Sequence, residues 1–312
     1  MAEALLVGRQ VLLIFLYVLI GIFCVKKKII TSEAGKQFSN FIVTVVMVSV
    51  VIKSYIRPME KQHLLGIVLA IGLAALFHIL AIIASSLFIK EREDIRYRIE
   101  RMGVVYSNCG FMGIPLIYAA VGDIGIFYAV AYISIFNIVL WSHGVMTLSG
   151  EKKINIKSAI INPALIAFTI GFIIYCTQIP VPNMIVEVLG SIADMNTPLA
   201  MIVTGVFLSN IDFKSTFANK RIYYVTALRL ILLPMIMLTI IKLLGVLSWM
   251  PGADEVVMTS ILGCACPAAA SITLFPAKYN MDGEYGAQII AVSTLLSVIT
   301  IPVFNLITNL WL

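Results

Sequence analysis

Two short stretches of the sequence place neutral polar residues, small residues and a proline inside otherwise apolar segments. The candidate ligand-binding residues are Asn108, Cys109, Gly110, Gly113 and Pro115 in the first stretch, and Pro267, Ala268 and Ser271 in the second. Proline lacks a backbone N–H and clashes with the preceding turn, so each stretch predicts a kinked or broken helix. Helix N-termini at such breaks present N–H donors and partial positive charge, which suits a carboxylate.

The Asn108 amide and the Ser271 hydroxyl add neutral groups to these predicted backbone donors. A neutral site has an advantage inside a membrane, because a dedicated buried charge costs several kcal/mol when the site is empty. For the first stretch alone, the alternative is an ordinary proline-kinked helix packed through its glycines. The second interrupted stretch favours a binding site. Cys109 is then expected to be reachable by water-soluble thiol reagents.

The elements that must position these stretches are apolar. Of 312 residues, 61% are hydrophobic and 12% are charged, and the mean hydropathy is +1.02. A soluble chain is about 45–50% apolar and about 25% charged. The composition therefore excludes a cytosolic enzyme, a nucleic-acid-binding protein and a disordered chain, and it predicts an all-α integral membrane protein.

Charged residues and turn formers divide the chain into ten apolar segments, and roughly 20 residues span a bilayer core. The predicted transmembrane helices are 8–25, 38–56, 64–89, 102–121, 125–147, 158–177, 186–208, 222–246, 255–276 and 285–311. The charged run 90–101 is predicted to be a solvated helical linker or a helix extension.

The distribution of lysine and arginine predicts the orientation of these helices. Alternate loops, beginning with 26–36, hold sixteen of these residues, whereas the opposite loops hold three, which are Lys53, Arg57 and Lys61. Positive residues favour the cytoplasmic side of a membrane. Both termini are therefore predicted to face outside, in a multi-pass protein of the plasma (cytoplasmic) membrane.

Ten helices suggest two five-helix repeats, residues 1–155 and 156–312. An odd number of crossings in each half makes the halves inverted relative to each other. The motif at 20–23 is echoed at 170–173, and Pro115 of the fourth segment is echoed by Pro267 of the ninth. Inverted repeats with interrupted helices at corresponding positions indicate a secondary transporter, with the fourth and ninth helices crossing at their breaks.

Motifs along nearly the whole chain carry a family resemblance. The pattern from Asn108 to Met112-Gly113-Ile114-Pro115 resembles the fourth-helix signature of the auxin efflux carrier family, which includes plant carriers and many bacterial permeases. Asp194 with Pro198, Arg229-x-x-x-x-Pro234, and the stretch from Pro267 to Asn280 resemble the family's seventh, eighth and ninth helices.

The resemblance implies an inverted-repeat fold related to bile-acid symporters and some sodium/proton antiporters. It implies a scaffold of helices 1, 2, 6 and 7 and a transport domain of helices 3–5 and 8–10 that moves like an elevator. It also implies an organic anion as substrate, such as indole-3-acetate, malate or malonate. Two departures favour a short bacterial-type member: 151–157 replaces the long hydrophilic loop of many plant carriers, and the family's second-helix proline is missing from 43–52.

Four ionisable residues lie in apolar context. Arg229 is interpreted either as a counter-charge to substrate or partner of an acid, or as a structural ion pair or a side chain that snorkels to the interface. Asp194 either binds a coupling proton or sodium ion or caps a helix start. His78 and His143 either are hydrogen-bonded in the core or relay protons.

The leading hypothesis is a secondary transporter. The alternatives are a channel or a non-transporting sensor, and a membrane-embedded enzyme. The sequence lacks His-Glu-x-x-His and Gly-x-Ser-x-Gly motifs, so no catalytic or metal-binding residue is assigned. No cofactor is expected apart from a coupling proton or sodium ion. The expected partners are a small organic anion and membrane lipids, without nucleic acid, and a homodimer is left open.

Overall fold

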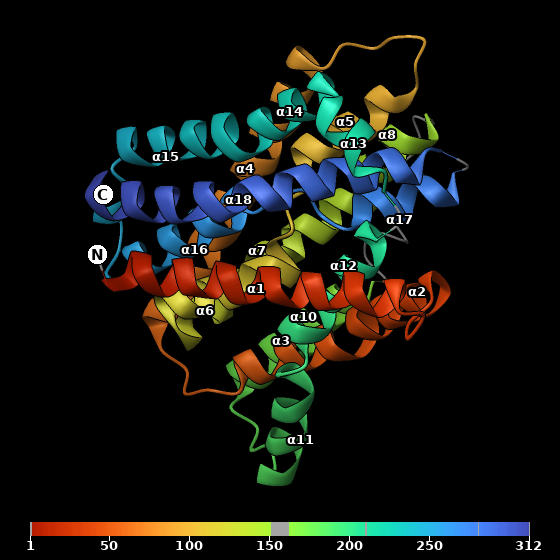
Figure 1. Ribbon diagram of the computed structural model, residues 1–312. Helices are drawn as coiled ribbons and strands as arrows, with labels where there is room; N and C mark the ends of the chain where they lie inside the picture. Colours follow the sequence, from red (N-terminus) through yellow and green to blue (C-terminus); the bar gives the residue numbers. More distant parts are fainter. Residues whose placement is uncertain (1, 151–161, 210, 280, 312) are drawn as a thin grey trace.

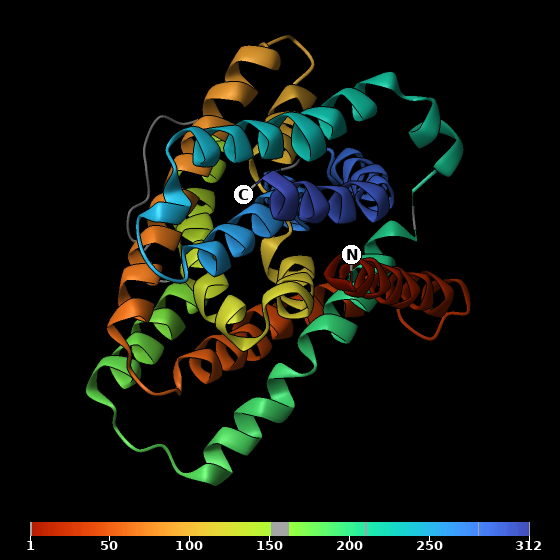
Figure 2. The ribbon, with the colours of Figure 1, turned by 90° about the vertical axis from the view of Figure 1, so that its left-hand side faces the viewer.

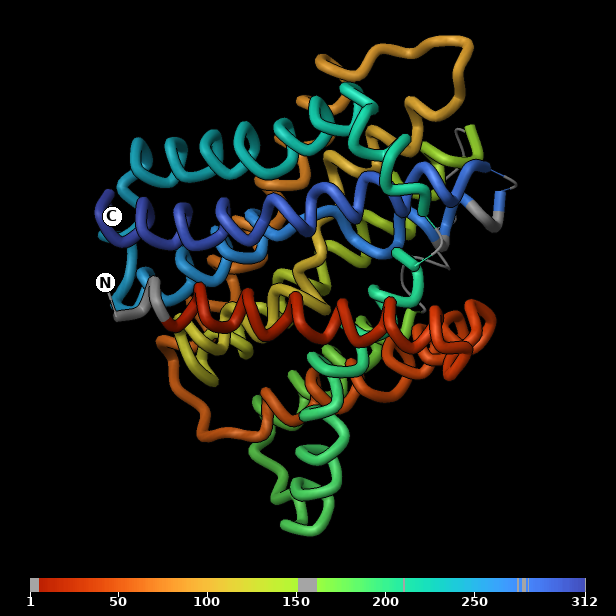
Figure 3. Tube along the Cα trace, in the orientation of Figure 1, coloured from red at the N-terminus to blue at the C-terminus, as the bar shows by residue number. Residues whose placement is uncertain are grey.

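The chain folds into a bundle of helices (Figures 1 and 3). The computed structural model describes residues 2–150, 162–209, 211–279 and 281–311. Within these ranges the only strand-type pairing is the bridge between Ser107 and Ala268, so the all-α prediction is confirmed. The loop 151–157, the predicted repeat boundary after residue 155 and the start of the segment 158–177 lie outside the described residues.

The helices of the first half of the chain combine α-helical and π-helical stretches. These are α1 (Ala2–Lys26), α2 (Ser32–Phe41), η1 (Ile42–Val46), α3 (Met47–Tyr55), α4 (Lys61–Phe88), α5 (Arg96–Val105), η2 (Cys109–Gly113), α6 (Ile114–Val121), α7 (Asp123–Val139), η3 (Leu140–Gly144) and α8 (Val145–Ser149).

The second half has the same character. Its described helices are α10 (Pro163–Thr177), α11 (Asn183–Ala193), α12 (Asn196–Leu208), α13 (Phe213–Ala218), α14 (Lys220–Ala227), η4 (Leu228–Leu232), α15 (Leu233–Leu243), η5 (Val246–Ser248), α16 (Ala253–Ala265), α17 (Ser271–Lys278) and α18 (Gly283–Trp311).

Each predicted segment overlaps helical residues, and several are long and apolar enough to cross a membrane. Among the described residues there are seven such helices, Leu6–Lys26, Ser32–Tyr55, Lys61–Phe88, Asp123–Ser149, Asn183–Leu208, Lys220–Leu243 and Gly283–Trp311. Cys109–Val121 and Pro163–Thr177 are shorter apolar helices. The protein is thus a multi-pass membrane protein, while ten crossings and inverted repeats stay predictions. Both termini lie at the same end of the bundle (Figures 1 and 2).

The break in the fourth segment lies earlier than the sequence pattern suggested. Helix α5 ends at Val105, three residues leave the helix, and the π-helical turn η2 follows. Pro115 lies within the continuous helix Cys109–Val121, where the π-helical turn η2 passes into α6. The expectation that the helix breaks at Pro115 was therefore wrong, whereas Pro267 does lie in the gap between α16 and α17.

Helices α1 and α12 approach each other through glycines. A Cβ atom added at Gly21 would overlap the carbonyl oxygen of Ile202, and one added at Gly205 would overlap that of Val18. Small residues allow such backbone contact between helices in a membrane. The two helices therefore form a closely packed pair within the predicted scaffold.

A buried carboxylate joins three elements at the opposite end of the bundle from the termini. Glu100 of α5 is fully buried and accepts hydrogen bonds from Arg92 at 2.7 and 3.0 Å, from Arg221 at 3.0 Å and from the Tyr285 hydroxyl at 2.8 Å. Burial alone would raise the pKa of Glu100, but hydrogen bonds from these groups outweigh it and lower the pKa. The ionised carboxylate thus anchors α5 to α14 and α18.

A valine at Gly21 is expected to separate α1 from α12 and to lower the free energy of unfolding by about 1–3 kcal/mol or more. The measurement is thermal melting of the purified protein in detergent. Gly8→Val is the matched control on the same helix, because no heavy atom lies within 4 Å of a Cβ at Gly8. Equal melting temperatures for the two variants would contradict the close contact.

Glu100→Gln is expected to destabilise the protein in a pH-dependent way. Because the folded-state pKa of Glu100 is lowered, its stabilising effect is complete above the ordinary glutamate value of 4.5 and is lost as pH falls below it. Melting curves from pH 7 to pH 4 should show wild type and variant converging in acid. Glu93→Gln is the control, because Glu93 is exposed. A loss of stability in Glu100→Gln that is the same at every pH would contradict the assignment of Glu100 as an ionised carboxylate.

Candidate functional site

The two interrupted helices meet at their breaks. Ser107 pairs with Ala268 in an antiparallel bridge, in which the Asn108 N–H donates to the Pro267 carbonyl at 2.7 Å and the Ala269 N–H donates to the Tyr106 carbonyl at 3.0 Å. These hydrogen bonds therefore pair backbone groups that each break leaves without a partner in its own helix. We refer to residues 106–108 and 266–270 as the crossover.

Arg229, in the π-helical turn η4, is fully buried behind the crossover. Its Nε donates to the Cys266 carbonyl at 3.1 Å, and one terminal nitrogen donates to the Val104 carbonyl at 2.9 Å and the Val105 carbonyl at 3.4 Å. The other terminal nitrogen donates to the Cys264 carbonyl. These carbonyls belong to the C-terminal ends of α5 and α16, which carry partial negative charge and lack intrahelical partners.

This arrangement differs from the roles that the sequence suggested for Arg229. Its guanidinium is engaged by backbone carbonyls, and it lies over the ring of Phe77 at 5.1 Å. None of the ion pairs found among the described residues includes Arg229. Its hydrogen bonds hold the C-terminal ends of two half-helices together in the core.

The N-terminal ends of the other half-helices open into a cavity of about 160 Å³, which we call the inner cavity. It is lined by Ser39, Val43, Met47, Ser107, Asn108, Gly110, Phe111, Ile133, Phe136, Asn137, Leu140, Trp141, Ala164, Ala269, Ala270, Ser271 and Phe275. None of these lining residues is charged. The inner cavity thus combines the predicted Asn108, Gly110 and Ser271 with an apolar and aromatic wall.

Several hydrogen-bonding groups at the inner cavity are unused. In the described part of the chain, no hydrogen bond engages the N–H of Phe111, Ala270 or Ser271. The hydroxyls of Ser107 and Ser271 are buried without a partner, and no described hydrogen bond uses the side-chain amide of Asn108. An unpaired buried donor costs free energy unless a ligand or water satisfies it. This set of groups can therefore donate hydrogen bonds to an anion.

The other predicted site residues lie around the inner cavity rather than in its lining. Cys109 is 1% exposed, and Gly113 would place a Cβ 3.5 Å from the Cys266 sulfur and 3.6 Å from the Cys109 Cβ. Pro267 and Ala268 form the crossover. The expectation that Cys109 is reachable from water is wrong for this conformation, because the turn of η2 directs Gly110 and Phe111 to the cavity and buries Cys109.

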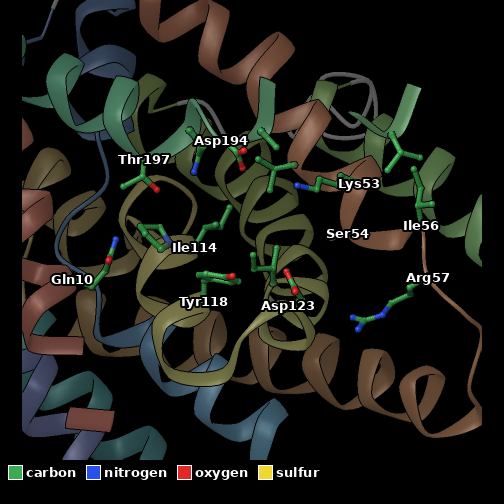
Figure 4. Close-up of a pocket in the computed structure, with 16 residues that line it drawn as sticks. Gln10, Lys53, Ser54, Ile56, Arg57, Ile114, Tyr118, Asp123, Asp194 and Thr197 are labelled. Carbon is green, nitrogen blue, oxygen red and sulfur yellow. The ribbon is translucent and has the colours of Figure 1, made fainter. Parts of the chain in front are cut away.

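Figure 4 shows a second, larger cavity of about 560 Å³, and no crossover residue is among those that line it. We call it the outer cavity; Pro115 and Asp194 are among its lining residues, together with Lys53, Arg57 and Asp123. None of the described ion pairs involves these four charged residues. Asp194 is exposed between α11 and α12 and does not cap α12. The outer cavity is therefore polar and charge-balanced, unlike the inner one.

The two histidines differ in their surroundings. His78 is buried on α4, where its Nδ1 lies 2.7 Å from the Ala74 carbonyl oxygen, as expected of a core histidine. His143, in η3, is half-buried and lies 2.9 Å from the hydroxyl of Tyr106 at the crossover.

Sequence reasoning missed several residues of the inner cavity. Asn137 donates from its amide nitrogen to the Ile133 carbonyl at 2.8 Å, and its side chain lines the cavity with Ser39 and Trp141. A lone asparagine in the apolar segment 125–147 was the available signal. Ser39 carries no such signal, because it stands near the polar start of its helix.

Comparisons with known proteins place the chain among membrane transport proteins. A family model described as "Membrane transport protein" matches residues 6–305. A protein named "Uncharacterized transporter" from Methanothermobacter thermautotrophicus is 25% identical over 203 residues, which are 64% of this chain and 64% of that protein. The alignment therefore spans a little under two thirds of that relative.

Replacing Arg229 with methionine is expected to destabilise the crossover strongly. The carbonyls of Val104, Cys264 and Cys266 would stay buried without their donor, at about 1–3 kcal/mol each. Thermal melting in detergent should show a much lower melting temperature for Arg229→Met than for the wild type. Arg229→Lys keeps the charge but lacks the planar set of five donors, so an intermediate loss is expected. A methionine variant as stable as the wild type would refute this role.

Proposed function

The chain belongs to the membrane transport protein family, and on that premise we propose that it is a secondary transporter of a small organic anion. The carboxylate binds at the crossover of the interrupted helices. Neutral donors hold it there: the Asn108 amide, the Ser271 hydroxyl, and the N–H groups of Phe111 and Ala270.

One observation carries the proposal: two separate cavities follow one another along the interrupted helix. Along η2 and α6, Gly110 and Phe111 line the inner cavity, whereas Ile114 and Pro115 line the outer one. The two cavities share no lining residue. A transporter that exposes one site alternately to two sides requires such a separation, whereas an open channel requires a continuous path.

The position of both cavities supports an elevator mechanism. Each lies between helices of the predicted scaffold and helices of the predicted transport domain: Met47 and Ala164 face Asn108 and Asn137 in the inner cavity. Movement of the transport domain along the scaffold would carry the crossover from one cavity toward the other. The contact of α1 with α12 and the Arg229 hydrogen bonds keep each part rigid during that movement.

The inner cavity favours a small substrate. Its volume of about 160 Å³ is below the roughly 300–1,000 Å³ of pockets for drug-sized ligands. Small mono- or dicarboxylates such as malate and malonate therefore fit the proposal better than indole-3-acetate. The proposal includes the cytoplasmic membrane as location, both termini outside, and no cofactor beyond a coupling ion.

Asn108→Ala is expected to reduce carboxylate uptake at least tenfold without unfolding the protein, because it removes an amide from the site while leaving the helix backbone unchanged. The measurement is uptake of radiolabelled malate, malonate and indole-3-acetate into proteoliposomes, with imposed proton and sodium gradients. Asn305→Ala is the control, since Asn305 is a fully buried amide that lines neither cavity. Wild-type uptake by Asn108→Ala would overturn the site, and no uptake of any carboxylate by wild type would overturn the function.

A further inference from the structure

His143 lies between two hydroxyl groups, one at each ring nitrogen. Its Nδ1 is 2.9 Å from the Tyr106 hydroxyl, and its Nε2 is 3.4 Å from the Thr147 hydroxyl. Each hydroxyl also has a backbone carbonyl acceptor: Tyr106 reaches the Val139 carbonyl at 3.1 Å, and Thr147 reaches the His143 carbonyl at 2.8 Å.

A hydroxyl has one hydrogen to donate and two lone pairs that accept. With their hydrogens directed to the carbonyls of Val139 and His143, both hydroxyls present lone pairs to the ring. A neutral imidazole carries one N–H and can use only one of these acceptors. The imidazolium carries two N–H groups, so the two hydroxyls can accept from both nitrogens of the protonated form of His143.

The histidine is directly connected to the crossover. Tyr106 precedes Ser107 and Asn108, which line the inner cavity, and its carbonyl accepts the Ala269 N–H. Gly144 leaves room for the tyrosine, because a Cβ there would lie 3.1 Å from the Tyr106 hydroxyl oxygen. The Tyr106 ring also packs edge-on against Phe136 of the cavity wall, with centroids 5.8 Å apart. His143 is thus one hydrogen bond away from the proposed anion site.

Among the described residues, the titratable groups identified near His143 are cationic or neutral. From α5, Arg101 acts electrostatically on His143, and Arg98 donates to the Leu148 carbonyl of α8 at 3.0 Å. From α4, the nearest titratable group is His78. The helical stretch 140–149 itself contains no acidic residue, and no acidic group from the described residues of α17 faces it. Arg101 therefore opposes a proton on His143 electrostatically.

We propose that His143 is the coupling-proton site: one proton binds there together with one anion at the crossover. This inference rests on the proposed function. The proton comes from water and adds to the free ring nitrogen, which converts imidazole to imidazolium, and it returns to water on the opposite side of the membrane. The positive charge offsets one negative charge of the substrate while both cross the apolar barrier. By linkage, each ligand then raises the affinity for the other.

The first test uses purified full-length protein in proteoliposomes. Wild type should accumulate malate faster when the outside is acidic, whereas His143→Gln should lose this stimulation and keep malate exchange in the absence of a gradient. Glutamine retains hydrogen bonding but does not titrate. His78→Gln is the matched control and should respond to the gradient like the wild type.

The second test measures proton uptake directly, with a pH indicator in weakly buffered detergent solution at pH 7.5. Malate binding should take up about one proton in wild type and none in His143→Gln, and malate affinity should rise as pH falls only in the wild type. Transport by wild type without proton stimulation, or a gradient response in His143→Gln equal to wild type, would overturn the inference alone. Absence of malate, malonate and indole-3-acetate transport by wild type would instead overturn the proposed function.

Discussion

The hydrogen bonds of Arg229 to the ends of two helices are the constraint on which the central structure depends. Bringing two broken helices together in an apolar core leaves their last carbonyls without partners and places two negative helix ends close together. One guanidinium, with donors in a planar fork, bonds to carbonyls of both α5 and α16. Because the C-terminal ends face Arg229, the N-terminal ends of the continuing half-helices face the inner cavity.

This polarity explains how a chain so poor in charge can provide the proposed site for an anion. The positive charge stays behind the crossover, buried and occupied by carbonyls, while the cavity in front of it has neutral donors only. At the end of the bundle away from the termini, the buried carboxylate of Glu100 holds α5, α14 and α18 together through hydrogen bonds from Arg221 and Tyr285. The two networks fix the interrupted helix at both ends of its first half, α5.

The sequence was sufficient for the class of fold and for part of the lining of the inner cavity. Apolar runs located the helices, and the pairing of Asn108 with Ser271 across the two interrupted stretches placed both at one cavity. The break itself was misplaced, because a π-helical turn such as η2 arises from tertiary contacts and leaves no local signature. The partners of Arg229 lie 35 to 125 residues away in the chain. Such contacts depend on how helices cross, which composition and spacing do not encode.

The unused N–H groups of Phe111, Ala270 and Ser271 have an evolutionary consequence. They belong to the main chain, so no substitution except proline removes them. Mutation can therefore reshape the walls at Asn137 and Trp141 without erasing the groups that attract an anion. Under the proposed function, a lineage of such proteins can change its preference among carboxylates in single steps, because recognition of charge rests on the main chain and selection of shape on the side chains.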